Sequence, residues 1–184
     1  MGISIGVVSV ESELIQACIR KESWAMQKLY EENYGSMYAI CIRYTSSKEE
    51  AVDILHDAFL KIFNKIETYE SGTMLQAWMK RVTVNTCIDH FRKESKRYHS
   101  DLDSAYGIAN DDMTAIQGMN LDEIMTAIQS LPMAYRTVFN MHIIDGYSHK
   151  EISDILHINE STSRSNLVKA RQKLKEILKG NDEE

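Results

Sequence analysis

Two short helical segments separated by a tight turn, in residues 148–179, constrain the fold more than any other stretch. Ser148 and Glu151 have the S-x-x-E spacing of a capping box, in which the two side chains satisfy backbone amides at a helix N-terminus. After a three-residue break at 157–159, Asn159 is a suitable N-cap for a second helix. Two short helices joined in this way predict a helix-turn-helix.

The second of these helices is basic, although the chain as a whole is acidic. Residues 164–179 contain six Lys or Arg and one acidic residue, a net charge of +5, whereas the whole chain carries −6. Lysines near a helix C-terminus are also favoured by the helix dipole, so a solvated face explains part of this charge. Residues 160–166, however, have short polar side chains, which suit hydrogen bonds to phosphates and base edges. The pattern favours DNA as the partner of this helix.

Helical spacing of apolar residues extends through most of the chain. The 184 residues include one Pro and 8 Gly, so helix breakers are few, and no run alternates as a strand would. The sequence predicts an all-α protein of two small helical domains, 11–97 and 120–179. A stretch without periodicity, 98–119, predicts a flexible acidic linker between them. Residues 1–10 and 180–184 are expected to be tails.

The residues show no pattern typical of an enzyme, a metal or cofactor site, or a membrane-spanning protein. Cys18, Cys41 and Cys87 are far apart in apolar contexts, and we expect them to be reduced, buried thiols. The cysteines and the six histidines show no metal-ligand spacing, and no glycine-rich phosphate loop or paired base and nucleophile is present. We therefore expect no enzyme, metal, cofactor or small-molecule substrate. The apolar N-terminal stretch is too short to span a membrane, so a cytoplasmic protein that is not membrane-inserted is expected.

A helix predicted over residues 47–66 has an acidic polar face. Ser47 begins it with a second capping box. Asp53, His56 and Asp57 follow at spacings of three and four, which places them on one side of the helix. This face suits a basic partner helix, and a solvated acidic face remains the simpler alternative.

A third capping box, Thr73 with Gln76, predicts a helix over residues 74–96. Residues 80–97 contain six basic and two acidic residues, so this is a second basic region. Trp78 lies on the apolar side and is assigned to the core in preference to a stacking wedge. Arginine and lysine suit phosphates, and asparagine can bind a base edge. The polar side holds Arg81, Asn85, Asp89, Arg92, Lys93 and Lys96.

Three runs of residues together resemble a known family. AVDILHDAFLKIFNKI resembles region 2.2 of bacterial RNA polymerase sigma factors of the extracytoplasmic-function type, within the sigma-70 family. TMLQAWMKRVTVNTCIDHFRKESKR resembles regions 2.3 and 2.4, and LPMAYRTVFNMHIIDGYSHKEISDILHINESTSRSNLVKARQKLKEIL resembles domain 4. The three runs have the order and spacing of the family and cover about residues 11–97 and 121–179. A helix-turn-helix alone would also fit a regulator that binds duplex DNA without core polymerase.

The resemblance implies a non-enzymatic factor that binds core RNA polymerase, at the beta-prime clamp and the beta flap, and directs it to promoter DNA. An anti-sigma factor is a further expected partner. Domain 2 is expected to read and melt the minus-10 element, with the loop at 67–72 and the following helix start holding an extruded base. Domain 4 is expected to read the minus-35 element.

The resemblance also assigns residues to each role. The residues expected to bind core polymerase are Asp53, His56, Asp57 and Phe63. Those expected at the minus-10 element are Arg81, Asn85, Asp89, Arg92, Lys93 and Lys96. Those expected at the minus-35 element are Thr162, Ser163, Arg164, Ser165, Lys169, Arg171 and Lys173.

Within the last group, the residue chemistry suggests different contacts. Arg164 is the best candidate for base readout, because arginine pairs bidentately with guanine. Arg171 and Lys173 are expected to contact phosphates. Two positions depart from the family pattern: His56 replaces the usual Gln, and His157 replaces the usual Gly of the turn. Glycine adopts positive φ without cost, so a reshaped or strained turn is expected at His157.

Overall fold

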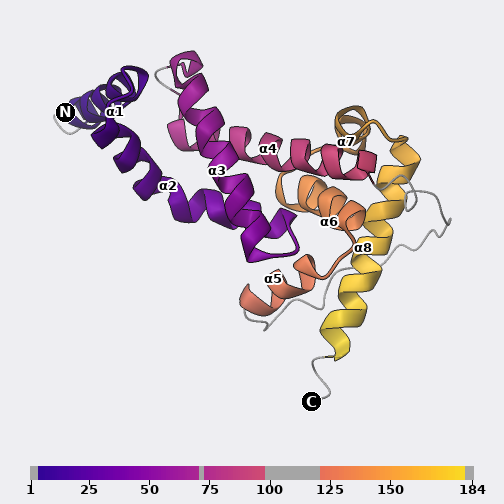
Figure 1. Cartoon of the computed structure of the whole chain (residues 1–184). Helices are drawn as coiled ribbons and strands as arrows, with labels where there is room; N and C mark the ends of the chain where they lie inside the picture. The colour runs from indigo at the N-terminus through magenta and orange to yellow at the C-terminus, as the bar shows by residue number, and fades with distance from the viewer. Residues whose placement is uncertain (1–3, 71–72, 98–120, 181–184) are drawn as a thin grey trace. The chain divides into compact units, whose positions relative to one another are not determined.

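A computed structural model describes residues 4–70, 73–97 and 121–180, and every regular element in these ranges is a helix (Figure 1). The prediction of an all-α protein is confirmed. The predicted linker, 98–119, lies outside the described residues. The elements are α1 (Ser4–Ile19), α2 (Ser23–Tyr44), α3 (Lys48–Lys65), the 3-10 turn η1 (Ile66–Thr68), α4 (Leu75–Arg97), α5 (Leu121–Gln129), α6 (Met133–Phe139), the π-helical turn η2 (Asn140–Ile144), α7 (His149–Leu156) and α8 (Glu160–Gly180).

The first helix begins earlier than the sequence indicated. Residues 1–10 were expected to be a tail, but α1 is continuous from Ser4. Extending an existing helix fixes one residue for each new hydrogen bond, whereas nucleation fixes several at once. The β-branched residues of this stretch therefore join a helix that the following residues already form.

The three predicted helix caps differ in how completely they form. The Ser148 cap is confirmed as a reciprocal capping box with Glu151, and hydrogen bonds from Ser148 hold the pKa of the Glu151 carboxyl below its usual value. Ser47 accepts a bond of 3.1 Å from the amide of Glu50, but the Glu50 carboxylate reaches the amide of Ser46 instead. Thr73 donates its hydroxyl to the carbonyl of Glu70, and α4 begins only at Leu75, so the third prediction was wrong.

The described residues group into two compact units. The first comprises Met1–Cys41 and Ala51–Cys87, and the second comprises Ile42–Glu50 and Ile88–Glu184. These boundaries cut α2, α3 and α4, so all three helices contribute residues to both units. They also differ from the predicted division into 11–97 and 120–179, because the end of α2, the start of α3 and the end of α4 group with the second unit.

The core of the first unit comes from three helices. Leu29 and Met37 of α2, Leu55 of α3 and Met79 of α4 are almost completely buried. Burying such side chains contributes roughly 1.5–3 kcal/mol each before the entropy cost is counted. Aromatic contacts add to this core, and the rings of Tyr30 and Phe59 lie 4.5 Å apart. Trp24 of α2, by contrast, is 55% exposed.

The three cysteines are buried thiols, as expected. Burial raises the pKa of the Cys18 thiol, which keeps it in the protonated, unreactive form.

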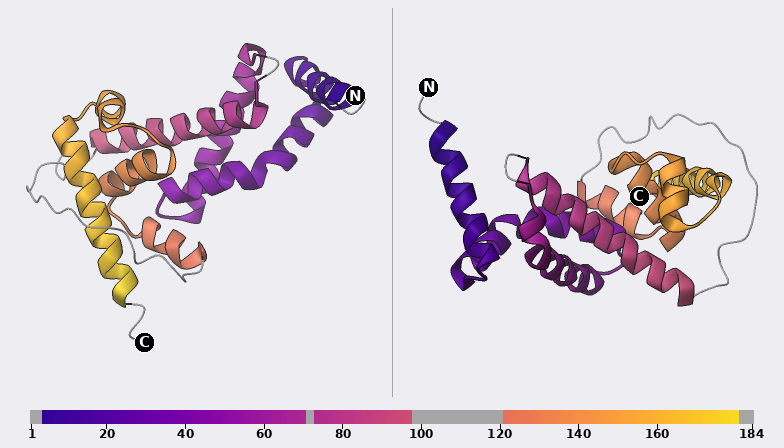
Figure 2. Two further views of the ribbon diagram at one scale, coloured as in Figure 1. Left: turned by 180° about the vertical axis from the view of Figure 1, so that it is seen from behind. Right: turned by 90° about the horizontal axis from the view of Figure 1, so that it is seen from above.

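The second unit is built around the helix-turn-helix. α6 and α7 pack beside α8, as both views of Figure 2 show. Val138, Met141 and Ile152 are fully buried between these elements. Residues 133–144 divide after Phe139 into α6 and the π turn η2. Pro132 is the N-cap of α6, with ψ of 142°.

Polar contacts tie residues 42–50 into the second unit. The side chain of the fully buried Asn140 donates to the carbonyl of Arg43 at 2.6 Å. Asp145 accepts from the hydroxyl of Tyr44 at 2.5 Å and forms an ion pair with Arg43. Buried polar groups are costly unless they are bonded, so these contacts fix the local backbone.

Candidate functional site

α8 has one face in the core and one face in solvent. The solvent side is lined by exposed or half-buried residues that share a helical spacing of three and four. They are Ser161, Arg164, Ser165, Val168 and Gln172. The opposite side is buried against α6 and α7, and it contains Ser163, Asn166, Leu167, Ala170, Leu174 and Leu178.

Arg164 is available at the centre of the solvent side. Its side chain is 63% exposed and forms an ion pair with Glu160, which is 45% exposed and lies one turn earlier. Surface pairs of this kind contribute about 0–1 kcal/mol, so a stronger acceptor can replace Glu160 at small cost. The geometry leaves Arg164 free to bind a base or a phosphate.

Ser163 must be withdrawn from the expected DNA contacts. It is fully buried, and its hydroxyl oxygen lies 2.9 Å from Nδ1 of His149. Ser163 precedes Leu167 by four residues and Ala170 by seven, so it shares their inward face. The same rule would have revealed Ser161 and Gln172, which lie on the solvent side but were missed in the sequence.

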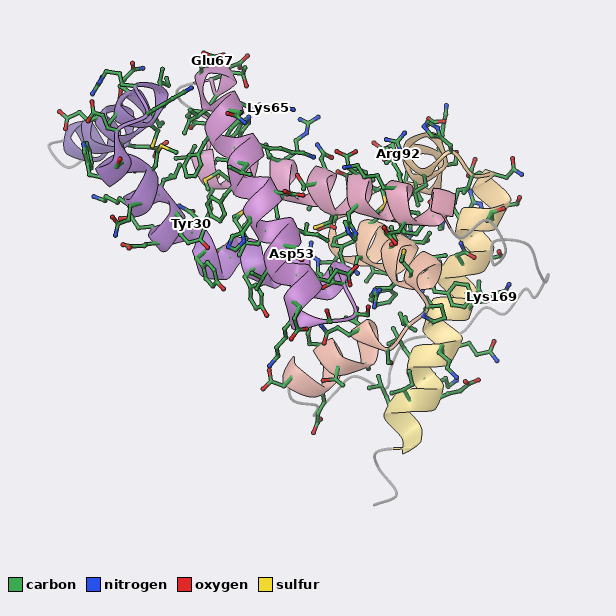
Figure 3. All side chains as sticks on the ribbon, viewed as in Figure 1. Tyr30, Asp53, Lys65, Glu67, Arg92 and Lys169 are labelled. Atoms are coloured by element: carbon green, nitrogen blue, oxygen red, sulfur yellow. The ribbon has the colours of Figure 1, made fainter. Side chains whose placement is uncertain are left out.

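The other expected minus-35 residues lie around the edges of the solvent side. Thr162 and Ser165 are half-buried. Lys169, labelled in Figure 3, has its ammonium 5.7 Å from the ring centre of Tyr135, a cation–π contact with α6. Arg171 is half-buried, whereas Lys173 is exposed and lies 3.5 Å from Glu176.

The turn between α7 and α8 has the unusual backbone that was expected at His157. This residue has φ of 56° and ψ of 44°, in the left-handed region that favours glycine. Its amide donates to the carbonyl of Ser153, which satisfies the end of α7. Its Nε2 contacts the guanidinium of Arg92 within the second unit.

Most of the expected minus-10 residues lie on one side of α4. Arg81, Asn85, Asp89 and Arg92 follow at spacings of four, four and three. Arg81 and Asn85 are exposed, and Arg92 is half-buried with Nη1 3.9 Å from Asp89. Lys93 is exposed on an adjacent side. The side chain of Lys96 lies outside the description.

The polar face of α3 contains a residue that the sequence reasoning missed. Asp53, His56 and Asp57 are exposed, as expected (Figure 3 labels Asp53). Leu60 is 60% exposed on the same side, seven residues after Asp53 and four after His56. The sequence did contain a signal for this exposed leucine, because its position does not match the helical spacing of the buried residues of α3. Phe63 is half-buried, with its ring 6.0 Å from that of Phe59.

A pocket of about 610 Å³ opens in the first unit beside the start of α4. Apolar and acidic side chains share its walls, and Met74 is 74% exposed at this position. The lining residues are Glu11, Leu14, Lys28, Leu29, Glu32, Asn33, Thr73, Met74, Leu75 and Gln76.

The described residues contain no group of three or more His, Cys, Asp or Glu that could hold a metal ion. In the same part of the chain, no helix is long and apolar enough to cross a membrane.

Comparison with protein families matches both helical parts of the chain. Residues 29–97 match the model "Sigma-70 region 2", and residues 121–174 match "Sigma-70, region 4". The chain is a member of the sigma-70 family. The region 2 match contains α3 and α4 with their polar faces, and the region 4 match contains the helix-turn-helix.

Curated relatives place this sigma factor in the extracytoplasmic-function (ECF) type. The ECF RNA polymerase sigma factor SigW of Bacillus subtilis is 28% identical over 157 residues, covering 78% of this chain and 83% of SigW. The ECF RNA polymerase sigma factor SigM of Mycobacterium tuberculosis (strain H37Rv) is 24% identical over 168 residues, covering 91% of this chain and 84% of SigM.

A solved structure has the same fold as this sigma factor. The sigma factor RpoE of Bartonella quintana, in complex with the anti-sigma factor NepR, matches with a TM-score of 0.50 and 22% identity. The match covers 83% of this chain and 96% of that chain.

Proposed function

We propose that this sigma factor binds core RNA polymerase through the exposed face of α3 and directs it to promoters through α4 and α8. The observation that carries this proposal is Leu60, an exposed apolar side chain that lies one turn after His56 and Asp57 and two turns after Asp53. Protein interfaces commonly have an apolar centre with a polar rim, and a cluster of carboxylates repels the phosphates of DNA. The face therefore supports a protein partner with basic residues, as the beta-prime clamp would be.

Within that proposal, α8 reads the minus-35 element. Arg164 lies on the solvent face beside Ser161 and Ser165, whose short polar side chains allow the helix to approach the major groove closely. Lys173 and Arg171 at the edges suit the flanking phosphates. Half-buried Ser165 and Thr162 add hydrogen-bonding groups near the groove. The beta flap is the proposed polymerase contact of region 4.

The minus-10 element is proposed to bind along α4 and the pocket beside its start. Arg81, Asn85 and Arg92 form one polar side for the DNA strand. The pocket is large enough for a base, and its carboxylates, Glu11 and Glu32, can accept hydrogen bonds from exocyclic amino groups. Capturing an extruded base offsets the few kcal/mol that unstacking costs.

An anti-sigma factor is the remaining proposed partner. Bartonella quintana RpoE was solved with one, and the α3 face and α8 both offer surfaces that such a protein can cover. The partner would compete with polymerase for exposed residues such as Leu60.

Reconstitution with core RNA polymerase tests the proposal. The full chain is mixed with purified core, and co-elution is measured by size-exclusion chromatography. Transcription is then assayed on a promoter library with randomised minus-10 and minus-35 elements. We expect co-elution, and enrichment of two separate elements among the transcribed promoters.

Two results would contradict the proposal. Tight binding to duplex promoter DNA by the chain alone, with no association with core, would indicate a simple helix-turn-helix regulator. Enrichment of one element only would show that either α4 does not read a minus-10 element or α8 does not read a minus-35 element. Permanganate reactivity of unpaired thymines adds a direct measure of minus-10 melting.

A further inference from the structure

Two histidines stack where α7 meets the rest of the helix-turn-helix. The rings of His142, in η2, and His149, the first residue of α7, have centroids 4.2 Å apart and an interplanar angle of 16°. Both rings are half-buried. Two rings at this separation cannot both carry a proton without strong repulsion. The pair is therefore stable only while at least one ring is neutral.

Hydrogen bonds fix the orientation of both rings. Nδ1 of His142 lies 2.7 Å from the carbonyl oxygen of Tyr147. Because a carbonyl only accepts, Nδ1 of His142 carries the hydrogen. Nδ1 of His149 lies 2.9 Å from the hydroxyl oxygen of Ser163, which is fully buried in α8. The stack thus connects η2 and α7 to the residue next to Arg164.

The charges around His149 disfavour its protonation. From η2 it faces His142, and from α8 it faces Arg164 and Arg171, with Glu160 as the opposing negative charge. Its position at the N-terminus of α7 adds the positive end of a helix dipole. Burial, then His142, Arg164 and Arg171, hold the pKa of His149 below its usual value, and Glu160 opposes them.

We propose that the His142–His149 pair is a pH-sensitive positioning device for the recognition helix. While His149 is neutral, it holds α7 against α8 through Ser163. Acidification puts a proton on this ring beside His142, Arg164 and Arg171, and their repulsion releases the hold. The proposal rests on the role of α8 proposed above, because Arg164 directly follows Ser163. If Ser163 changes its position, the adjacent Arg164, which is proposed to read the minus-35 element, moves with it.

The direction of the pH effect follows from linkage. In the unfolded chain a histidine titrates near pH 6.5, and in the folded chain His149 titrates lower. The unfolded state therefore binds more protons between these two values. The contribution of neutral His149 to stability is complete above about pH 6.5. It declines as the pH falls toward the folded pKa.

An NMR titration of the full chain, without DNA or polymerase, tests the proposal. Histidine ring and backbone amide resonances are followed from about pH 8 to about pH 5, the range in which histidine titrates. We expect the ring of His149 to titrate below about pH 6.5. The amides of Ser163 and Arg164 should shift with the same midpoint.

Two variants separate the stack from the other histidines. His149→Gln retains a neutral side chain with hydrogen-bonding groups but cannot titrate, so the amide shifts in α8 should disappear. His90→Gln removes a histidine of α4 outside the stack and should leave those shifts unchanged. Urea unfolding at both ends of the pH range should show a smaller pH dependence for His149→Gln than for the unmodified chain.

The proposal is overturned if His149 in the unmodified chain titrates at or above the usual histidine pKa. It is equally overturned if the α8 amides do not follow the titration of His149. Neither result depends on the variants folding. A failure of the proposed DNA role would instead appear as absent promoter binding by the holoenzyme at neutral pH, with the NMR titration unaffected.

Discussion

The exposed faces of α3 and α8 differ in what stands at their centres. On α3 it is Leu60, which follows Asp53, His56 and Asp57 within two turns. On α8 it is Arg164, with the short polar side chains of Ser161 and Ser165 beside it. An exposed leucine gains free energy only by leaving water, which a protein surface allows and a DNA groove edge rarely does. This difference supports the proposal that α3 binds a protein partner and α8 binds DNA.

The largest expected effect tests the protein-binding half of this comparison. Leu60→Ala should weaken binding to core polymerase by about 2 kcal/mol, on the order of 30-fold, because a central apolar contact is lost. Since Leu60 is largely exposed, the folded chain should be unaffected. Titration of fluorescently labelled chain with core measures the affinity. Lys65→Ala, on another side of α3, is the matched control and should bind normally. Equal affinities for the two variants would break the comparison.

The DNA-binding half is tested at Arg164. Arg164→Ala should relax the preference at one minus-35 position and cost about 1–3 kcal/mol there, because a bidentate base contact is removed. Holoenzyme binding to promoters with single substitutions measures this preference. Lys173→Ala should weaken all promoters evenly, as expected of a phosphate contact. An even loss for Arg164→Ala as well would show that Arg164 also binds phosphate.

The inward side of α8 gives a sharper test. Ser163→Ala removes a buried hydrogen bond and should lower the free energy of unfolding by about 0.5–1.5 kcal/mol. Ser165→Ala, two residues later and half-buried, should leave stability nearly unchanged and affect promoter binding instead. Urea unfolding and holoenzyme binding are measured for both variants. Reversed outcomes would mean that the faces of α8 are misassigned.

The smallest effect concerns the ion pair that holds Arg164. Glu160→Gln removes its partner and a repulsive charge near DNA, so promoter binding should tighten by less than about 1 kcal/mol. The gain should shrink at high salt because the interaction is screened. Weaker binding in the variant would show that Glu160 positions Arg164 for its contact.

Sequence reasoning recovered the helical class, the helix-turn-helix and its cap at Ser148, because these depend on local rules. Capping boxes and left-handed turns involve neighbouring residues, so Ser148 and His157 could be interpreted from sequence alone. It failed at Ser163, a polar residue that is buried, and at Leu60, an apolar residue that is exposed. A serine is small enough to be buried when one hydrogen bond is available, and only the arrangement of α7 and α8 supplies His149 as its partner.

The sequence by itself determined that the chain is helical, where most helices begin, and which helices are basic. These properties follow from spacing, caps and charge, which act within a few turns. The tertiary structure alone decided which side of α8 faces solvent, and it brought His142 beside His149. It also decided that Asn140 bonds the backbone of Arg43, about a hundred residues earlier. Such contacts depend on packing between segments far apart in the chain, which no local pattern encodes.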